Sequence, residues 1–436
     1  MSFCGKLRKM LREKFLLSET RILWTIFFAF LIVRVSFVLL SGYDNFELFD
    51  DTSRYNLQSD AILAGKFNLL SNDLNELESL FITAPFYPYL QALFKLLFGS
   101  YWILAFQTTQ ILLCCLSGVF LYKTAKIIWN RDDVAIIASA IYCFYPLTLW
   151  WVHTFGQEMP FQCLLIFTVF FLLKAVYKNH FPSLIISAVL FSSAFLTKSH
   201  ILLFAPFIPL FIFLAENKTL KQKLAYAAAF SIICFVFTLP YGLYNLKVNG
   251  VYVISSTGQG TLFLIGHNDD MYKAIVSPPR AAAIMGYEVI SRLKARSENL
   301  THSEIQKLYF DEGIKWCLEN PQKFLKLKIY NLYYFLTPGL NPNYYTFNRW
   351  LAAFIISFPV YIFAYFGIFS SLKQNFRKHF WILGLFVSMI IFSVGFYVQN
   401  RFRTVTIELF YILYAAMPIA DSFHLLTAKI FLQSKK

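Results

Sequence analysis

Long apolar runs, separated by short polar turns, occupy most of the chain. A helix needs about 20 mostly apolar residues to cross a bilayer. Ten runs approach that length and predict transmembrane helices at 22–41, 101–122, 134–152, 159–176, 181–197, 199–215, 224–243, 349–372, 379–398 and 405–422. Two shorter apolar stretches, 86–98 and 325–337, are typical of interfacial or re-entrant helices. The pattern predicts an all-α polytopic membrane protein with about 10–12 transmembrane helices.

Lysine and arginine gather in turns on one side of this arrangement. With ten crossings, the basic N-terminus, the tail and the turns at 123–131, 174–178, 218–223 and 373–378 all fall on the same side. Basic loops mark the cytoplasmic side of a membrane protein. Counting 86–98 as a further crossing would break the alternation, so we expect a hairpin or a surface helix there.

The charge pattern divides the chain into consecutive regions. A basic cytoplasmic N-terminus (1–21) precedes a transmembrane region (22–243), which includes an acidic external loop (42–85) and is expected to carry the chemistry. A second external loop (244–324) with a helical pattern near 302–318, a C-terminal transmembrane region (325–422) and a cytoplasmic tail (423–436) follow. The two external loops predict a non-cytoplasmic cap on a membrane domain.

Composition supports a membrane protein and argues against two other classes. The chain is 58% hydrophobic and 14% charged, whereas a soluble domain carries roughly 25% charged residues. The net charge of +15 would be compatible with nucleic-acid binding. Because the basic residues lie in short turns between apolar runs, we expect no nucleic-acid partner. The seven cysteines show no CxxC or Cys/His spacing, so no disulfide framework and no metal site is predicted.

The first external loop holds an acidic pair, Asp50 and Asp51, at the start of an amphipathic helical pattern. A carboxylate just outside the first span could accept a proton from a hydroxyl group, or hold a metal near a phosphate. Capping of the following helix is the structural alternative. The loop ends at Pro85-Phe86-Tyr87-Pro88, where two prolines set a rigid entry into the next apolar stretch.

Further ionisable residues lie at the outer ends of spans, where they are candidates for a functional site. Glu158 opens one span, Lys198 lies in a short external turn, and Arg401 and Arg403 precede the last span. Guanidinium and ammonium groups there could hold a phosphate. The alternatives are an interfacial glutamate held by Trp and His, and cations that snorkel to the interface. Arg34, in the outer half of the first span, poses the same question.

A segment rich in small residues follows the span at 224–243. It includes Ser255-Ser256-Thr257-Gly258 and then Gly266-His267-Asn268. Glycine allows close backbone approach to a ligand, and the amide and hydroxyl groups could donate to phosphate or sugar oxygens. A generic turn is the alternative. The segment is not a Walker loop, so no nucleotide site is indicated.

In their order, these segments resemble the GT-C membrane glycosyltransferases, and within them the bacterial branch related to protein O-mannosyltransferases and the lipid A aminoarabinose transferase. The resemblance extends over about 20–422. Its matching positions are Asp51 and Tyr55 of an Asp-x-x-x-Tyr pattern, then Pro85, Tyr87, Pro88, Phe98, Gly99, Glu158, Lys198, Asn245, Ser256 to Gly258, Gly260, Leu262, Gly266 to Asn268, and Arg401 to Arg403.

The chain departs from the pattern of this branch at several positions. Tyr244 stands where an arginine is usual, Ala84 replaces the first proline of a Pro-Pro pair, and Thr404 replaces a proline after Arg403. An acidic residue that some relatives carry upstream of the prolines is missing, since Thr83 stands there. These departures bear on a second catalytic carboxylate, for which Glu76, Glu78 or Glu158 could substitute.

The resemblance implies an inverting transfer of a sugar from a polyprenyl-phosphate donor to a lipid, glycan or protein acceptor. Asp51 would be the base, with Asp50 as second choice and Glu158 as a further catalytic carboxylate. The substrate and its phosphate would be bound by Tyr55, Tyr87, Lys198, His267, Asn268, Arg401 and Arg403. No cofactor is required, although a divalent metal is compatible with the chemistry. The protein would sit among the lipids of a bacterial inner membrane, with its site facing the periplasm or exterior.

Other functions remain open from the residues alone. A transporter or flippase for lipid-linked sugars should place charged residues or broken helices near the middle of the bilayer. The ionisable candidates here gather at the outer boundary, which favours an enzyme. A structural protein would leave the acidic loop and the outer arginines without a purpose. An oligosaccharide ligase is a nearer alternative, because it also uses lipid-linked sugars outside the membrane.

Overall fold

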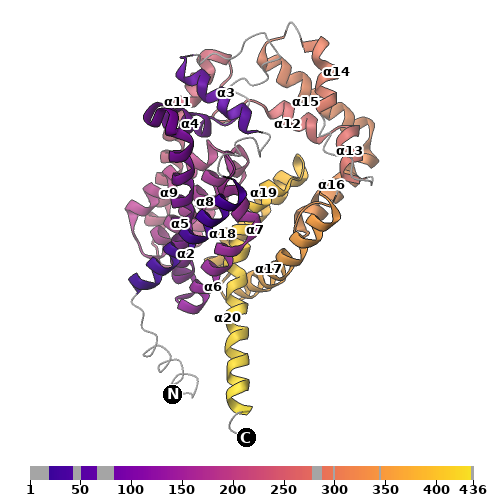
Figure 1. The fold of residues 1–436 in the computed structure, drawn as a ribbon. Helices are drawn as coiled ribbons and strands as arrows, with labels where there is room; N and C mark the ends of the chain where they lie inside the picture. Colours follow the sequence, from indigo (N-terminus) through magenta and orange to yellow (C-terminus); the bar gives the residue numbers. More distant parts are fainter. Residues whose placement is uncertain are drawn as a thin grey trace.

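The structure is a computed structural model that describes residues 19–42, 51–65, 83–276, 287–297, 300–342 and 345–433. This described part is helical and contains no strand. Long helices form a bundle, and a group of shorter helices covers one end of it (Figure 1). The predicted all-α polytopic fold is confirmed.

Seven helical segments in the described part are long and apolar enough to cross a membrane. One of them, Phe86–Trp129, joins α4 (Phe86–Phe98), η1 (Gly99–Tyr101) and α5 (Trp102–Trp129). The others are α2 (Glu19–Ser41), α8 (Glu158–Tyr177), α11 (Leu220–Asn249), α17 (Phe347–Gln374), α18 (Phe376–Gly395) and α20 (Ile407–Gln433). Each contains, or overlaps for most of its length, one of the spans predicted from hydropathy.

The three remaining predicted spans are a bent helix pair and two short helices. α6 (Asp132–Phe144) is followed at a 60° bend by α7 (Pro146–Leu149) and η2 (Trp150–Val152). α9 (Phe181–Phe195), and η3 (Ser199–Phe204) with α10 (Phe207–Leu214), are apolar but shorter. At 1.5 Å per residue, α9 is about 22 Å long, which is less than the ~30 Å of a bilayer core.

The bend after α6 follows from Pro146. Tyr145 precedes this proline and adopts an extended conformation, which ends the helix and leaves carbonyl groups of its last turn without partners. The buried Arg34 side chain of α2 fills this gap by donating to the Tyr142 and Cys143 carbonyls. Arg34 therefore links α2 to α6 inside the bundle. It neither binds a phosphate nor snorkels to the interface, the two roles that the sequence left open.

The stretch 86–98 is not a separate crossing. Gly99 has a φ of +52°, a conformation that favours glycine, and it ends α4 just before α5 begins. α4 lies beside α3 (Thr52–Leu63) at the covered end of the bundle (Figure 1), and Lys95 of α4 pairs with Asp60 of α3 at 2.6 Å. This arrangement agrees with the surface helix that the charge pattern required.

The cap is built from α3 and from helices of the second loop. These are α12 (Gln259–Gly266), α13 (Asp269–Val276), α14 (Tyr287–Ser297) and α15 (His302–Glu319). The next helix, α16 (Pro321–Leu336), contains most of the short apolar stretch predicted at 325–337. α15 confirms the helix predicted near 302–318, and a capping box between Thr301 and Glu304 starts it. α16 packs on α18 and α13, and so connects the cap to the bundle.

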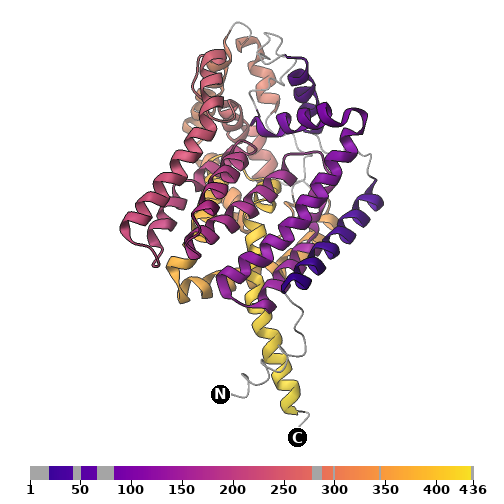
Figure 2. The same ribbon diagram turned by 90° about the vertical axis from the view of Figure 1, so that its left-hand side faces the viewer.

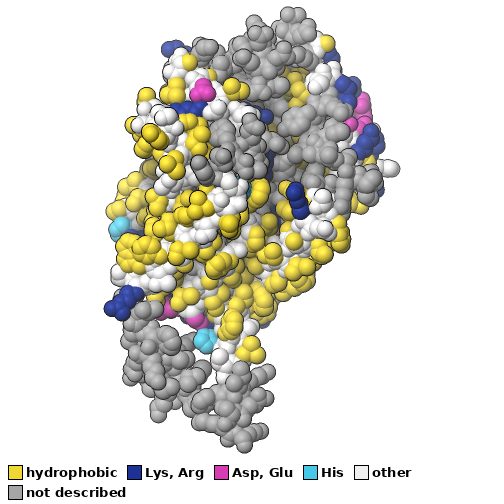
Figure 3. Space-filling view, viewed as in Figure 1, with side chains coloured by type: hydrophobic (Ala, Val, Ile, Leu, Met, Phe, Trp, Pro, Cys, Tyr) yellow, Lys and Arg dark blue, Asp and Glu magenta, His cyan; other side chains and the backbone are white. Residues whose placement is uncertain are grey.

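Burial differs between helices as expected for a bundle surrounded by lipid. In α8, 83% of the apolar window is buried inside the protein, against 17% in α11. Figure 2 shows α2 and α5 side by side on the outside of the bundle, and they are in contact. Apolar side chains cover the middle of the face seen in Figure 3. The protein is an integral, multi-pass membrane protein with α8 near its centre.

Candidate functional site

Four charged side chains from four separate segments meet at the capped end of the bundle. They are Asp51 at the start of α3, Glu158 at the start of α8, Lys198 between α9 and η3, and Arg401 in α19 (Asn400–Thr404). Lys198 Nζ lies 2.7 Å from Glu158 Oε1, and Arg401 Nη1 lies 2.5 Å from Asp51 Oδ2 and 3.9 Å from Glu158 Oε1. We call these four residues the charged cluster. The sequence marked each of them separately, and the tertiary structure brings them together.

Asp51 is held by arginines and does not cap its helix. It occupies the N-cap position of α3, but its side chain makes no capping hydrogen bond. It pairs with Arg401, and with Arg54 one turn along at 3.8 Å. Burial alone would raise the pKa of the Asp51 carboxyl, but Arg401 and Arg54 outweigh burial and hold this pKa below its ordinary value. Asp51 is therefore a carboxylate at neutral pH, and Arg54 is a neighbour whose i,i+3 spacing could have been recognised.

Glu158 and Lys198 form a buried ion pair. The Glu158 side chain is 0% exposed and that of Lys198 is 3% exposed. Burial lowers the pKa of Lys198, and the nearby Glu158 charge opposes this effect. The second carboxylate oxygen, Glu158 Oε2, has no hydrogen-bond partner among the described residues. Since buried polar atoms are nearly always paired, this oxygen is available to a substrate hydroxyl or a water molecule.

Tyr55 and Tyr87 form an aromatic wall next to the charged cluster. Their rings meet edge to face with centroids 4.8 Å apart, and both side chains are buried. Burial and the Asp51 and Glu158 charges raise the pKa of Tyr55 well above its ordinary value. Tyr55 therefore keeps its phenolic proton beside the two carboxylates. The sequence predicted both tyrosines as substrate-binding residues, and the structure places them beside the cluster.

Three other predicted residues make their contacts elsewhere. Arg403 donates to Glu408 and to backbone carbonyls, as described below. His267 bonds the Phe263 carbonyl and stacks on the Phe263 ring, and burial lowers the pKa of His267 to about 3. Asn268 bonds the backbone at both ends, accepting from Met271 N and donating to carbonyls of α12. No contact joins these three residues to the charged cluster in the described part. Asp50 lies outside the described residues.

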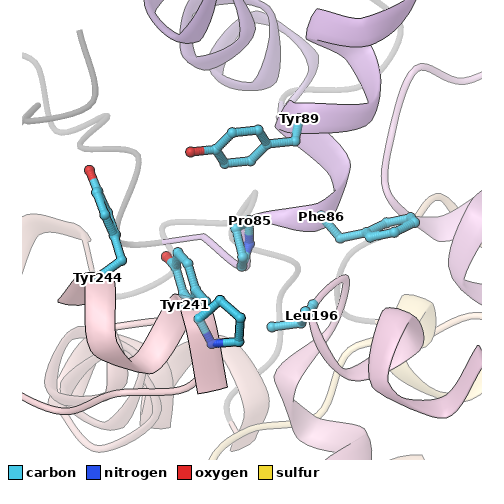
Figure 4. A pocket seen from close by; sticks show the side chains of 7 residues that line it. Pro85, Phe86, Tyr89, Leu196, Tyr241 and Tyr244 are labelled. Atoms are coloured by element: carbon cyan, nitrogen blue, oxygen red, sulfur yellow. The ribbon is translucent and has the colours of Figure 1, made fainter. Parts of the chain in front are cut away.

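A pocket of about 310 Å³ lies beside the first turn of α4 (Figure 4). Its floor is apolar, and the hydroxyl groups of Tyr89 and Tyr244 point toward each other across it. The sequence marked Tyr244 only as a departure from the arginine usual there, and did not predict a pocket. The lining residues are Pro85, Phe86, Tyr89, Leu196, Pro240, Tyr241 and Tyr244.

The pocket and the charged cluster share a wall. Phe86 N donates to the Leu196 carbonyl at 2.9 Å, which ties α4 to the turn that ends in Lys198. Tyr87, the residue after Phe86, points to the other side and joins the aromatic wall. Among the described residues, no group of three or more His, Cys, Asp or Glu side chains could hold a metal ion. That the reaction requires no divalent metal stays a prediction.

Comparisons with known proteins identify the fold. Residues 83–244, which carry Tyr87, Glu158 and Lys198, match the dolichyl-phosphate-mannose-protein mannosyltransferase family. A search of curated proteins finds no match. The archaeal oligosaccharyltransferase AglB from Archaeoglobus fulgidus, in complex with an inhibitory peptide and a dolichol-phosphate, matches with a TM-score of 0.55 and 14% identity over 95% of this chain and 52% of that one.

The apo form of the Archaeoglobus fulgidus oligosaccharyltransferase matches equally well, with a TM-score of 0.56 and 13% identity over 95% of this chain and 52% of that one. The chain thus spans about half the length of these structures. ArnT from Cupriavidus metallidurans, bound to undecaprenyl phosphate, matches with a TM-score of 0.37 and 14% identity over 89% of this chain and 77% of that one. The chain shares its fold with these oligosaccharyltransferase structures, and its residues 83–244 resemble the mannosyltransferase family, in agreement with the GT-C resemblance seen in the sequence.

Proposed function

We propose that this protein transfers a sugar, with inversion, from a polyprenyl-phosphate donor to a hydroxyl-bearing lipid, glycan or protein acceptor on the non-cytoplasmic side. The observation that carries the proposal is the charged cluster, in which two carboxylates and two cations from distant segments meet at the capped end of the bundle. Glycosyl transfer requires both kinds of group, a proton acceptor for the incoming hydroxyl and cations for the departing phosphate.

The cluster divides these roles between its members. Asp51 accepts the proton of the acceptor hydroxyl as its oxygen attacks the anomeric carbon. The bond between that carbon and the phosphate oxygen breaks, and its electron pair leaves with the polyprenyl phosphate. Lys198 and Arg401 stabilise the negative charge that develops on this phosphate. Glu158 orients Lys198 through one oxygen, and its free Oε2 can bind an acceptor hydroxyl.

Donor binding changes the partner of Arg401 in this proposal. Arg401 holds Asp51 in the unliganded protein and keeps the pKa of that carboxyl low, which makes Asp51 a weak base. A donor phosphate competes for the same guanidinium group. As Arg401 turns to the phosphate, the Asp51 pKa rises toward its ordinary value, and Asp51 becomes a better proton acceptor. Proton transfer is thereby coupled to the presence of the donor.

The family and the fold support this donor class and leave two alternatives to test. The match to the mannosyltransferase family covers Glu158 and Lys198, two of the four cluster residues, and the solved structures of the same fold include one with dolichol-phosphate. The fold of an oligosaccharyltransferase favours an oligosaccharide ligase as the second candidate, with a longer sugar chain on the donor. A flippase would instead move the donor across the membrane without consuming it.

The test is sugar transfer by the purified protein in detergent, with polyprenyl-phosphate sugars extracted from bacterial membranes. We expect wild type to transfer or hydrolyse the donor, and Asp51→Asn to lose roughly 10²–10⁴-fold in rate, the usual contribution of a general base. Asp60→Asn is the matched control, because Asp60 lies on the same helix and pairs with Lys95 away from the cluster. It should retain full activity.

Other results would change the assignment. Equal activity of Asp51→Asn and wild type would move the base to Asp50 or Glu158. Donor movement across liposomes without consumption would replace the enzyme by a flippase. Activity that chelators abolish and a divalent cation restores would establish a metal requirement, against our expectation that none is needed.

A further inference from the structure

Arg403 sits at the centre of a buried hydrogen-bond network inside the bundle. Its side chain is 2% exposed, and each of its three guanidinium nitrogens donates to a protein acceptor. Nε bonds Glu408 Oε1 at 2.6 Å. Nη1 donates to the carbonyls of Tyr334, Phe335 and Thr337, and Nη2 donates to the carbonyl of Gly339.

These bonds join the short helix α19 to α16, to the loop after α16 and to α20. The carbonyls belong to the end of α16 and to the loop that leads to α17. Glu408, at the start of α20, also accepts from Tyr361 of α17 and, at 3.1 Å, from Tyr145 at the bend between α6 and α7. All members of the network are protein groups, so Arg403 is fully satisfied without a ligand.

α19 has only five residues, Asn400–Thr404, and is too short to be stable alone. Successive helical residues are about 100° apart, so positions i and i+2 point to nearly opposite sides. Arg401 and Arg403 have this spacing. Arg401 reaches outward to Asp51 and Glu158, while Arg403 reaches inward to Glu408 and the loop carbonyls. Anchoring one arginine therefore fixes the direction of the other.

We propose that Arg403 is a positioning residue: with Glu408 it locks α19 to the bundle and so places the Arg401 guanidinium in the charged cluster. Arg403 acts through Arg401 and does not itself contact the donor phosphate, in contrast to the direct phosphate contact that the sequence resemblance implied. This inference rests on the proposed glycosyl transfer, which assigns the charged cluster its chemistry.

The test compares Arg403→Gln, Arg401→Gln and the double variant in the full-length protein. A misplacement of about 1 Å can reduce a rate by roughly 10²-fold. We therefore expect Arg403→Gln to lower kcat by about 10–100-fold in the wild-type background and to have little further effect when Arg401 is already glutamine. Arg403→Lys keeps the charge opposite Glu408 but loses the fork to the carbonyls, and should retain an intermediate kcat.

Amide hydrogen exchange gives a readout that does not need catalysis. In Arg403→Gln and Glu408→Gln, we expect faster exchange in the segments 399–406 and 334–340, with α8 unchanged. Arg34→Gln is the matched control, since Arg34 is another buried arginine that donates to helix-end carbonyls. It should destabilise the protein without speeding exchange in 399–406.

The outcomes separate this inference from the proposed function. If Arg403→Gln lowers kcat by the same factor with and without Arg401, or leaves exchange in 399–406 unchanged, the positioning role is wrong. If wild type consumes no donor, the proposed function fails. The exchange experiment then still decides whether Arg403 orders α19.

Discussion

The Glu158–Lys198 pair shows that the role of a charged residue depends on its surroundings in the fold. Each could be interpreted as an interfacial side chain, the glutamate held by Trp and His and the lysine snorkelling to water. The structure buries both and pairs them with each other at 2.7 Å. A buried charge without a partner is strongly destabilising, so each residue makes the burial of the other tolerable. Glu158 Oε2 is left without a hydrogen-bond partner in the part of the chain that the structure describes.

This pairing predicts an asymmetry between single and double substitutions. Lys198→Met leaves the Glu158 charge buried and should lower the free energy of unfolding by about 3–5 kcal/mol. The double variant Glu158→Gln with Lys198→Met removes both charges and should cost clearly less. Denaturation of the purified variants in detergent measures the difference.

The control is an exposed ion pair of the same protein. Arg377 and Glu216 are 59% and 61% exposed, and Arg377→Gln should cost no more than about 1 kcal/mol. A double variant at least as unstable as Lys198→Met would show that the two charges do not compensate each other.

At the scale of elements, close helix contacts depend on small residues. α17 and α20 have one of the most extensive contacts in the described part. A Cβ atom on Gly367 of α17 would lie 2.1 Å from the Tyr414 carbonyl oxygen of α20. Small residues allow such close backbone approach between membrane helices. The contact matters for the site because α20 carries Glu408 at its start.

Gly367→Ala should therefore separate α17 from α20 and lower stability by about 1–3 kcal/mol, the usual effect of overpacking. Helix propensity alone would make the alanine variant about 1 kcal/mol more stable. A loss of stability therefore indicates overpacking at the contact. Gly395→Ala in α18 is the matched control, since a Cβ there meets nothing within 4 Å. Thermal unfolding in detergent gives the comparison, and equal stability of the two variants would refute the close contact.

Hydropathy correctly predicted which segments are apolar helices, but it did not predict where those helices bend or break. All ten predicted spans coincide with apolar helices of the structure. Sequence analysis did not predict the 60° bend after α6, although Pro146 was the visible signal for it. The short helix α19 also escaped prediction, because five residues show no periodicity and tertiary hydrogen bonds stabilise it.

At the scale of the whole molecule, the charged cluster and the basic turns lie at opposite ends of the bundle. The cluster faces the cap, whereas the described basic turns at 123–131, 174–178, 218–223 and 373–378 lie at the other end of the bundle (Figure 1). The positive-inside pattern then predicts that the cap faces the exterior. A polyprenyl-phosphate donor would present its sugar on that side.

This orientation predicts opposite labelling of two engineered cysteines, in a background in which Cys4 and Cys317 are serine. Lys315→Cys, on the exposed face of α15, should react with a membrane-impermeant thiol reagent in intact cells. Lys221→Cys, in a basic turn at the start of α11, should react only after permeabilisation. The reverse pattern would place the site in the cytoplasm and exclude the proposed donor geometry.

The sequence by itself determined that the protein lies in a membrane, that its fold is all-α and which charged residues are candidates for the site. Apolar run length, basic turns and isolated ionisable residues at span ends are local properties of the chain, set by the bilayer's thickness and by the cost of placing charge in it. Asp51, Glu158, Lys198 and Arg401 could therefore be found without coordinates.

Only the tertiary structure decided which of these residues meet. Asp51 and Arg401 are 350 positions apart in the sequence, and only the tertiary fold makes them neighbours. Arg401 and Arg403 look equivalent in the sequence, but a short helix turns them in opposite directions, one into the cluster and one into the bundle. Helix direction and the partners of buried charges depend on contacts between distant segments, which local sequence patterns do not contain.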